Sequence, residues 1–361
     1  MASSHEKSTT VRTEMPTERD AQQRRMARMR PVFGVLERVA PWLGARLAFD
    51  AWTTPTRPDV QAVARSREGG LGEVRTLQIE LPDWTGRRPT KRDGTLKPPR
   101  TVEIAVELLG PEDGPLVYLL HGWGGWRGQF APIGRRLAAS GHRVVLIDGP
   151  NHGDSGPGAL GPNRELLPDF SRTLAAVARE FGPAHAVVGH SLGAACTADA
   201  LLDGVKADKA VFLAPPIDPF AFTRYLAGLL GFGERTRIRT VGIAERLTGV
   251  DFASLVLPPR LAGRTDLPPA LVVHDTEDAV VPISTGRLLA ESWPDARIIE
   301  TSSLGHNRIL RDKAVVETVA EFIESDGEQF AGDALTPGQG RRQRRNCGVD
   351  GASMAGTTPV S

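Results

Sequence analysis

Short apolar runs alternate with longer amphipathic segments from Leu116 onward, and this alternation limits the possible folds more than any other feature of the chain. Each run is long enough for one buried strand, while the intervening segments repeat apolar residues at helical spacing, as at Leu167, Phe170 and Leu174. This order predicts an α/β fold with a mostly parallel central sheet, helices on both faces and a ligand site at the carboxyl ends of the strands. The runs are residues 116–120, 143–147, 185–189, 209–214, 270–274 and 297–301.

Two features outside this alternation complete the predicted domain. Residues 74–81 and 101–108 have strand-like patterns, and the Pro-, Arg- and Lys-rich segment between them predicts a hairpin at the sheet edge. About 55 residues separate two later strands, far more than a simple crossover needs. We therefore expect one domain over residues 72–325 with a small helical cap inserted at about 215–268.

The pentapeptide Gly189-His190-Ser191-Leu192-Gly193 joins one predicted strand to a helix-forming stretch. A serine on so sharp a turn is held clear of the sheet, and flanking glycines leave room where strand and helix approach each other. Ser191 is therefore our candidate nucleophile. The alternative is a structural serine in an ordinary turn, because the pattern by itself is short enough to occur by chance.

A serine hydroxyl needs a histidine base and a carboxylate that orients the base. His306 follows the last predicted strand between a glycine and an asparagine, and it is the candidate base; a loop histidine bonded to backbone is the alternative. Asp278 lies in an acidic loop after the preceding strand and is the candidate acid. Asp218, Asp275 and Glu277 are the other acids near strand ends that could take this role.

The order Ser191, Asp278, His306 resembles that of the α/β-hydrolase superfamily, in particular its serine esterases and lipases. A second similarity is Leu-Leu-His-Gly-Trp-Gly-Gly at residues 119–125. The resemblance extends over residues 101–325. It implies the α/β-hydrolase fold and a nucleophile elbow whose serine works with the other two side chains.

The resemblance also assigns an oxyanion hole. In the family, the residue after the His-Gly pair and the residue after the serine supply the two backbone N–H groups, which here are Trp123 and Leu192. A third similarity is the Asp-containing loop at 148–155, where this chain departs from the family with Pro150 and Asn151. That departure leaves the shape of this loop open.

We expect an apolar acyl pocket between the cap and the core, because the cap is rich in aromatic and aliphatic residues. Most of these residues should pack the cap onto the core, and some should line the pocket beside Trp123. His190 could touch substrate, as could His121 and His152, but loop histidines near glycines more often bond carbonyls. The tentative pocket residues are Trp126, His190, Phe220, Phe222 and Tyr225.

Residues 31–55 repeat apolar side chains at three- and four-residue steps, which predicts an amphipathic helical segment that Pro41 kinks or splits. We expect this segment to pack on the hydrolase domain; contact with a membrane surface is the alternative. Residues 1–30 and 326–361 are predicted to be disordered, because they are polar and rich in Arg or Gly. The side chains that would make the membrane contact are Arg24, Arg25, Arg28, Arg30, Phe33 and Trp42.

Composition narrows the classes of protein that fit. A formal net charge of +1 argues against a nucleic-acid partner. Cys196 and Cys347 form no disulfide framework, no stretch is apolar enough to span a membrane, and the histidines lack metal-binding spacing. We expect a cytoplasmic protein that uses no cofactor and no metal.

These patterns together predict a serine hydrolase that cleaves a carboxylic ester or thioester of a small-molecule substrate through an acyl-enzyme intermediate. The same site also supports acyltransferases and cofactor-free perhydrolases, so fold resemblance leaves the acyl acceptor open. A catalytically silent scaffold that only binds a ligand is a further alternative. A dinucleotide loop is disfavoured, because Arg127 stands where its third glycine would be.

Overall fold

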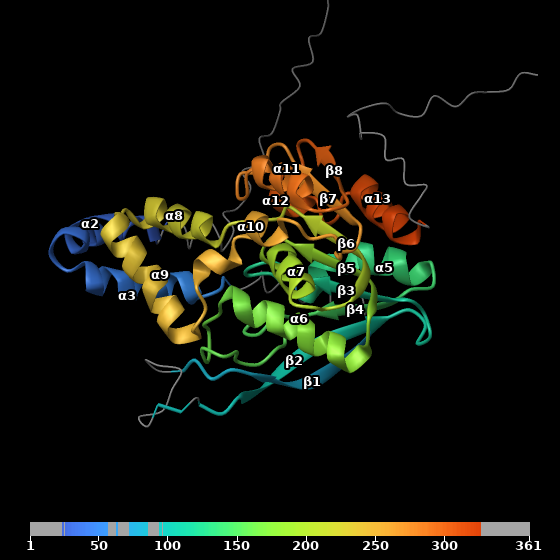
Figure 1. Ribbon diagram of the computed structural model, residues 1–361, viewed down its shortest axis with the longest axis horizontal. Coiled ribbons are helices and arrows are strands. Elements are labelled where there is room, and N and C mark those ends of the chain that lie inside the picture. Colours follow the sequence, from blue (N-terminus) through green and yellow to red (C-terminus); the bar gives the residue numbers. More distant parts are fainter. Residues whose placement is uncertain are drawn as a thin grey trace, which may run out of the picture.

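The central sheet carries eight strands in the order β1-β2-β4-β3-β5-β6-β7-β8 in the computed structural model, which describes residues 24, 26–56, 63, 72–85, 94, 95 and 97–325 (Figure 1). β1 pairs antiparallel with β2, β2 pairs antiparallel with β4, and all other neighbours are parallel. The strands are β1 Glu73–Leu81, β2 Arg100–Leu109, β3 Leu116–Leu120, β4 Arg143–Ile147, β5 Ala184–His190, β6 Ala207–Leu213, β7 Ala270–Asp275 and β8 Ala296–Thr301. The mostly parallel sheet and its edge hairpin are therefore confirmed.

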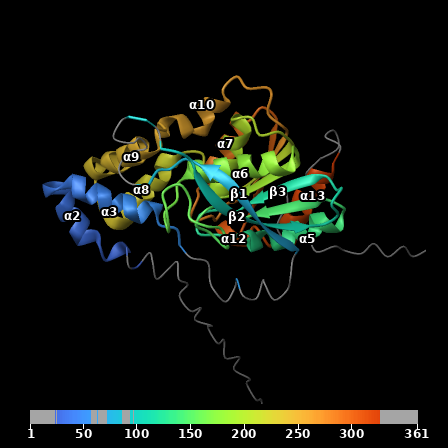
Figure 2. The same cartoon turned by 90° about the horizontal axis from the view of Figure 1, so that it is seen from below.

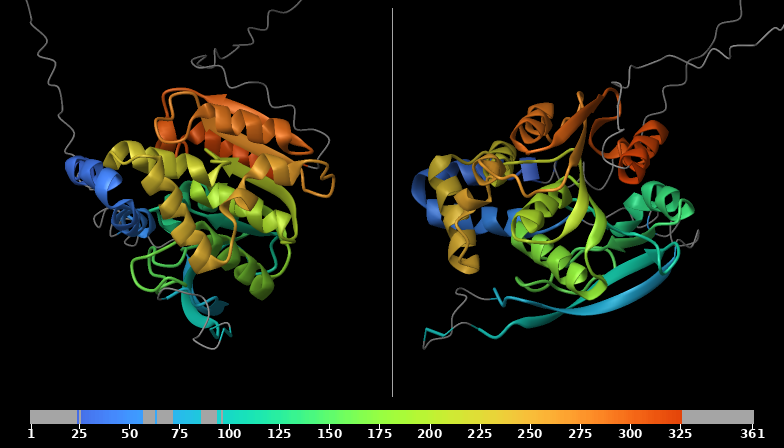
Figure 3. Two further views of the ribbon diagram at one scale, coloured as in Figure 1. Left: turned by 60° about the vertical axis from the view of Figure 1, so that its left-hand side comes forward. Right: turned by 45° about the vertical axis from the view of Figure 1, so that its right-hand side comes forward.

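Helices cover both faces of this sheet, as Figure 3 shows. Alternate residues of each inner strand point to opposite faces, so both faces need apolar side chains and the strands become continuous apolar runs. In β3, for example, Leu119 packs among the α5 and α13 residues, whereas Leu120 packs in the other apolar core. The helices of the first face are α5 Ala131–Ala139 and α13 Lys313–Glu324; those of the second are α6 Leu167–Phe181, α7 Leu192–Leu202 and α11 Ile283–Ser292.

The segment between β6 and β7 is helical, and we call it the cap. It consists of α8 Pro219–Leu230, α9 Glu234–Thr248, a 3₁₀ turn at Phe252–Leu255 and α10 Leu257–Leu261. Gly231 and Gly249 end α8 and α9 in left-handed conformations, with φ of 76° and 69°. These C-terminal caps set the sharp turns that fold the two longer helices against each other.

The amino-terminal helices extend the cap. α2 Arg30–Val39 and α3 Pro41–Thr53 are separate helices, because Pro41 starts a new helix after Ala40, at φ −149° and ψ 61°. α3 packs along α9, and α2 packs beside α8, so both lie at the cap end of the molecule (Figures 1 and 2). We expected this segment to pack on the hydrolase domain, and the part of that domain it contacts is the cap.

Two of our predictions fall largely outside the described residues. Predicted disorder in 326–361 lies wholly outside them. Of the segment 1–30, the structure describes residues 24 and 26–30, which include helical turns leading into α2. The loop between β1 and β2 is described only in part.

Candidate active site

Ser191 stands on the turn between β5 and α7, with φ 52° and ψ −122°. A residue other than glycine rarely adopts this conformation, so the surrounding structure has to hold it in place. The Ser191 N–H donates to the Leu213 carbonyl at 2.9 Å, which ties the turn to the neighbouring strand β6. A Cβ at Gly122 would lie 2.8 Å from the Ser191 Cβ, so only glycine lets that loop cross the serine.

His306 lies on the short helix α12 Gly305–Arg308, which follows β8. Its Nε2 lies 2.9 Å from the Ser191 Oγ, and its Nδ1 lies 2.7 Å from the Asp278 Oδ2. The carboxylate can only accept, so Nδ1 donates and Nε2 is left to accept the serine proton. The structure therefore brings the three sequence-predicted side chains into one hydrogen-bonded chain.

Asp278 lies in the loop after β7, and its carboxylate is buried. Its Oδ1 accepts the N–H groups of Val280 and Val281 at 2.8 and 2.9 Å. Burial by itself would raise its pKa, but hydrogen bonds from His274 and His306 outweigh burial and hold the pKa of Asp278 far below its usual range. The group facing the imidazole is therefore a carboxylate at any ordinary pH.

The alternative acids are engaged elsewhere. Asp218 caps α8 by accepting the Phe220 N–H at 2.7 Å and also pairs with Arg224. Asp275 accepts the Thr301 hydroxyl at 2.7 Å, and Glu277 accepts the Ser303 hydroxyl at 3.1 Å. In the structure Asp278 is the acid that meets the histidine.

His190 supports the histidine from the strand side. Its Nε2 donates to the His306 carbonyl at 2.8 Å, and the centroids of the two rings are 4.8 Å apart. Burial lowers the pKa of His190 to about 3, so the ring is neutral. It fixes the backbone of His306 without adding a charge beside it.

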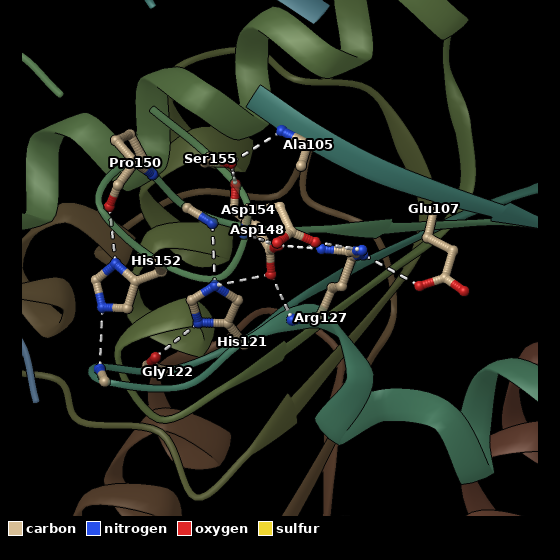
Figure 4. Close-up of polar contacts among 12 residues, drawn as sticks. Ala105, Glu107, His121, Gly122, Arg127, Asp148, Pro150, His152, Asp154 and Ser155 are labelled. Atoms are coloured by element: carbon tan, nitrogen blue, oxygen red, sulfur yellow. Dashed lines mark hydrogen bonds and ion pairs between the residues drawn. The ribbon is translucent and has the colours of Figure 1, made fainter. Parts of the chain in front are cut away.

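Two more histidines shape the loop that carries Trp123 (Figure 4). His121 accepts the Gly149 N–H on Nε2 at 3.0 Å and donates from Nδ1 to the Gly122 carbonyl at 2.7 Å. His152 accepts the Gly124 N–H on Nε2 at 3.0 Å and donates to the Pro150 carbonyl. Burial lowers the pKa of His121 to about 4 and that of His152 to about 3, so both rings are neutral.

These bonds use the amide of Gly124 and the carbonyl of Gly122, but not the Trp123 N–H between them. That N–H and the Leu192 N–H at the start of α7 have no hydrogen-bond partner within the described residues. Two unpaired backbone donors, one following Gly122 and one following Ser191, suit an oxyanion. The structure also shows the shape of the 148–155 loop. Asn151 adopts a left-handed φ of 59°, which asparagine tolerates, and its side chain donates to the Arg164 carbonyl.

Beneath the Trp123 loop, Arg127 is 3% exposed and bonded to three carboxylates (Figure 4). Its guanidinium contacts Glu107 at 3.1 Å, Asp154 at 2.9 Å and Asp148. Its backbone N–H also donates to Asp148 at 2.6 Å. The sequence marked Arg127 only as a residue that breaks a dinucleotide pattern, and its structural role came from the fold.

Residues 117–318 match the profile of the Alpha/beta hydrolase family. This chain belongs to the alpha/beta hydrolase family. It is 31% identical over 265 residues to a pimeloyl-[acyl-carrier protein] methyl ester esterase of Chromobacterium violaceum, in a match that covers 62% of this chain and 99% of that protein. It is 28% identical over 234 residues to a monoacylglycerol lipase of Mycolicibacterium smegmatis, covering 53% of this chain and 80% of the lipase.

Solved structures share the fold of this α/β hydrolase. A putative lipase from Acinetobacter baumannii superimposes with a TM-score of 0.50 at 13% identity, over 74% of this chain and 97% of the lipase. The profile match over residues 117–318 confirms the superfamily membership expected from the motifs. Within the described residues, no cluster of His, Cys, Asp and Glu could hold a metal ion, and no helix has the length and apolarity to cross a bilayer.

The α/β hydrolase has a cavity of about 650 Å³ that reaches from Ser191 and His306 into the cap. The cap and the amino-terminal segment both contribute to the wall of this cavity. The cap supplies Phe222, Tyr225, Leu226, Leu229 and Phe252, and the amino-terminal segment supplies Met26, Ala51, Trp52, Thr54 and Thr56. Trp123 and His190 also line the cavity. A space of this size lined mainly by apolar side chains suits a small apolar ligand.

Two of the expected pocket residues do not line this cavity. The Trp126 indole is 6% exposed and folds back over Gly128, where a Cβ would collide with its ring. Phe220, in the first turn of α8, packs under the Arg237 guanidinium, 6.0 Å from the ring centroid. Trp123 and Trp52 provide the indoles at the cavity instead. Phe220 and Phe222 lie on the same helix, but only Phe222 lines the cavity. Composition does not show in which direction each side chain points.

The sequence also failed to identify a buried acid pair. Glu165 lines the cavity and is fully buried, and its carboxyl group lies beside that of Asp169. Burial and the mutual repulsion of the two groups raise the pKa of Glu165 well above its ordinary value, and burial raises that of Asp169 to about 6. Glu165 and Asp169 are four residues apart at the start of α6, and this spacing is the sequence signal that could have identified the pair.

Proposed function

We propose that this α/β hydrolase cleaves carboxylic esters or thioesters by nucleophilic catalysis, with Ser191 as nucleophile, His306 as base and Asp278 as the orienting acid. The observation that carries the proposal is the hydrogen-bonded chain from Asp278 through His306 to Ser191, with distances of 2.7 and 2.9 Å. Folding alone does not require a serine in this strained conformation at the end of such a chain of hydrogen bonds. Nucleophilic catalysis does, because the chain lets the histidine take the serine proton.

In the first step, the Ser191 Oγ attacks the acyl carbonyl while the His306 Nε2 takes its proton. Asp278 stabilises the resulting imidazolium through Nδ1. The negative charge that develops on the carbonyl oxygen is stabilised by the Trp123 and Leu192 N–H groups, each worth about 3 kcal/mol. His306 then gives its proton to the leaving alcohol or thiol, and an acyl-enzyme remains.

In the second step, water enters and gives a proton to the His306 Nε2 as its oxygen attacks the acyl carbon. The same two N–H groups stabilise the second oxyanion. The proton returns to the Ser191 Oγ as the acyl bond breaks, and the free acid leaves. Nothing in this cycle needs a cofactor.

The cavity supports an apolar acyl group. Its wall around Trp52, Leu226 and Phe252 can exclude water from an alkyl chain, while Glu165 adds a polar group to the same wall. The two curated relatives act by name on esters, one a methyl ester and one a monoacylglycerol. Both names agree with a carboxylic ester as substrate class, and neither fixes the acyl group of this protein.

The test is hydrolysis of p-nitrophenyl esters of graded acyl length, together with covalent labelling by an alkyl fluorophosphonate. We expect Ser191→Ala to lower kcat/KM by about 10⁴- to 10⁶-fold and to abolish labelling, with the label found on Ser191 in the unmodified protein. The control is Ser140→Ala, which removes a hydroxyl at the end of α5. Labelling of another residue, or full activity of Ser191→Ala, would refute the assignment.

Asp278→Asn tests the role of the acid separately. The amide would turn its NH₂ toward the His306 Nδ1 and force the proton onto Nε2, where it can no longer accept from the serine. We expect kcat to fall by about 10³- to 10⁴-fold. Asp218→Asn, an acid at another strand end, should leave kcat unchanged, and the reverse outcome would exchange the two assignments.

A further inference from the structure

One face of α2 is fastened to the cap. The side chains of Arg30, Phe33 and Glu37 lie on this face at three- and four-residue steps, so they share one side of the helix. Phe33 is 2% exposed and packs on Phe232 with ring centroids 5.5 Å apart. Arg30 donates to the Gly228 carbonyl, and Glu37 accepts the N–H groups of Arg235 and Thr236.

The opposite face of the same helical hairpin is apolar, and no residue that the structure describes covers it. Of the thirteen large apolar side chains that the described residues expose, seven lie between Met29 and Leu47. Val39 and Trp42 are the most exposed of all, at 73% and 63%, and they flank the turn between α2 and α3. The seven are Met29, Val32, Val35, Val39, Trp42, Leu43 and Leu47. A patch this concentrated marks an interaction surface.

The hairpin turn projects at one end of the long axis of the molecule, farthest from the sheet (Figure 1). We call the group of Val35, Val39, Trp42 and Leu43 around this turn the apolar tip. No described part of the sheet domain stands beside it (Figures 1 and 3). A flat surface can therefore reach the apolar tip without meeting the domain that holds Ser191.

The charge around the apolar tip is positive. Arg38 and Arg46 are exposed on α2 and α3. The two acidic residues of these helices are already engaged, Glu37 with the start of α9 and Asp50 with Arg164. Exposed basic side chains beside exposed aromatic and aliphatic ones are the combination that binds the interface of an anionic bilayer.

We propose that the apolar tip docks onto the surface of a phospholipid bilayer that bears anionic headgroups, with Arg38 and Arg46 at headgroup level. The hairpin would lie in the interface rather than span it. A second copy of the chain fits this surface less well, because a twofold interface at the tip would set the same arginines against each other. This inference concerns binding and does not depend on the proposed function.

Docking would also orient the cavity. α8 packs beside α2, and its Phe222 and Tyr225 are both exposed and part of the cavity wall. These two rings therefore stand at the mouth of the cavity, on the element next to the docking helix. An apolar ligand dissolved in the bilayer would meet them on leaving it.

The experiment is co-sedimentation of the full chain with vesicles of phosphatidylcholine alone and of an equal mixture with phosphatidylglycerol. We expect binding to the mixed vesicles to exceed binding to the neutral ones by about tenfold or more. Trp42 fluorescence should shift to shorter wavelength and be quenched by brominated lipid. Val39→Ser/Trp42→Ser should abolish binding, and Arg38→Gln/Arg46→Gln should remove the preference for anionic lipid.

The matched control is Val74→Ser/Leu288→Ser, which removes two exposed apolar side chains on the sheet domain and should leave vesicle binding unchanged. Equal sedimentation with and without vesicles would overturn the proposal. So would equal binding by the tip variant and the control variant. A dimer that Val39→Ser/Trp42→Ser dissociates, without any vesicle binding, would instead assign the tip to a second copy. Ester hydrolysis in vesicle-free buffer should be the same for all these variants.

Discussion

The His274 Nε2 lies 3.5 Å from the Asp278 Oδ2, the same oxygen that accepts from His306. The His274 ring is fully buried at the end of β7, and its Nε2 also contacts the Val281 carbonyl at 3.0 Å. Gly286 on α11 packs against this ring, where a Cβ would collide with it. A second histidine thus contacts both the Asp278 carboxylate and the backbone of the loop that carries it.

Replacement of His274 by leucine should damage both stability and activity. Asp278 and the Val281 carbonyl would lose a donor, which we expect to lower the free energy of unfolding by about 1–3 kcal/mol. The pKa of Asp278 should rise toward its ordinary value, and a shifted loop should lower kcat by about 10- to 100-fold with little change in KM. His274→Gln, which keeps a donor, should recover part of kcat. His142→Leu, a second buried histidine, is the control and should leave kcat unchanged.

Trp52→Phe should move the acyl-length optimum toward longer chains. The Trp52 indole lines the cavity and meets Phe252 edge to face at 5.4 Å, so a smaller ring keeps the contact and opens space. The control is Trp84→Phe, which makes the same change at a buried site away from the cavity. Both should cost about 1–3 kcal/mol of stability, measured by urea unfolding. A shift of the optimum in the control as well would refute the role of Trp52.

The Glu165–Asp169 pair should make the protein less stable as pH rises. Both folded-state pKa values lie above those of the unfolded chain, about 6 against 3.8 for Asp169, so unfolding releases protons between these values. The free energy of unfolding should therefore fall by about 1–3 kcal/mol from pH 4 to pH 6. Urea titrations across this range measure the slope.

Asp169→Asn is the matched variant for that slope. Its amide can donate to the Glu165 carboxylate without a shared proton, so the decrease between pH 4 and pH 6 should be smaller. Asp203→Asn, at an exposed carboxylate, should retain the slope of the unmodified protein. An unchanged slope in Asp169→Asn would mean that another group causes it.

Arg127→Met should be among the most destabilising single changes in the sheet domain. It leaves the buried Asp148 carboxylate without its cation, which we expect to cost about 3–5 kcal/mol in urea unfolding. Arg136→Met removes an arginine that also pairs with two glutamates, Glu317 and Glu324, but at the surface. That loss should stay below about 1 kcal/mol. Similar costs for the two variants would contradict the role of burial.

Much of the fold could be predicted because its signals are local. The β3 and β4 runs were identified with their bounds, since a strand buried on both faces must be apolar at nearly every position. The elbow at Ser191 was recognisable because its two glycines flank the serine within five residues, although only Gly189 meets backbone inside the turn and Gly193 meets the distant Leu120 carbonyl. Trp126 and Phe220 were misplaced, because composition identifies an apolar residue without giving the direction of its side chain.

The sequence by itself determined the strands, the helical periods and the elbow, since each depends on residues a few positions apart, and the order of the three candidate side chains is read directly along the chain. Only the tertiary structure decided which groups meet. His306 reaches Ser191 across 115 residues, His274 supports Asp278 from inside the core, and α3 lies along α9. These contacts depend on how helices and strands far apart in the chain pack together, and short-range periodicity carries no information about that packing.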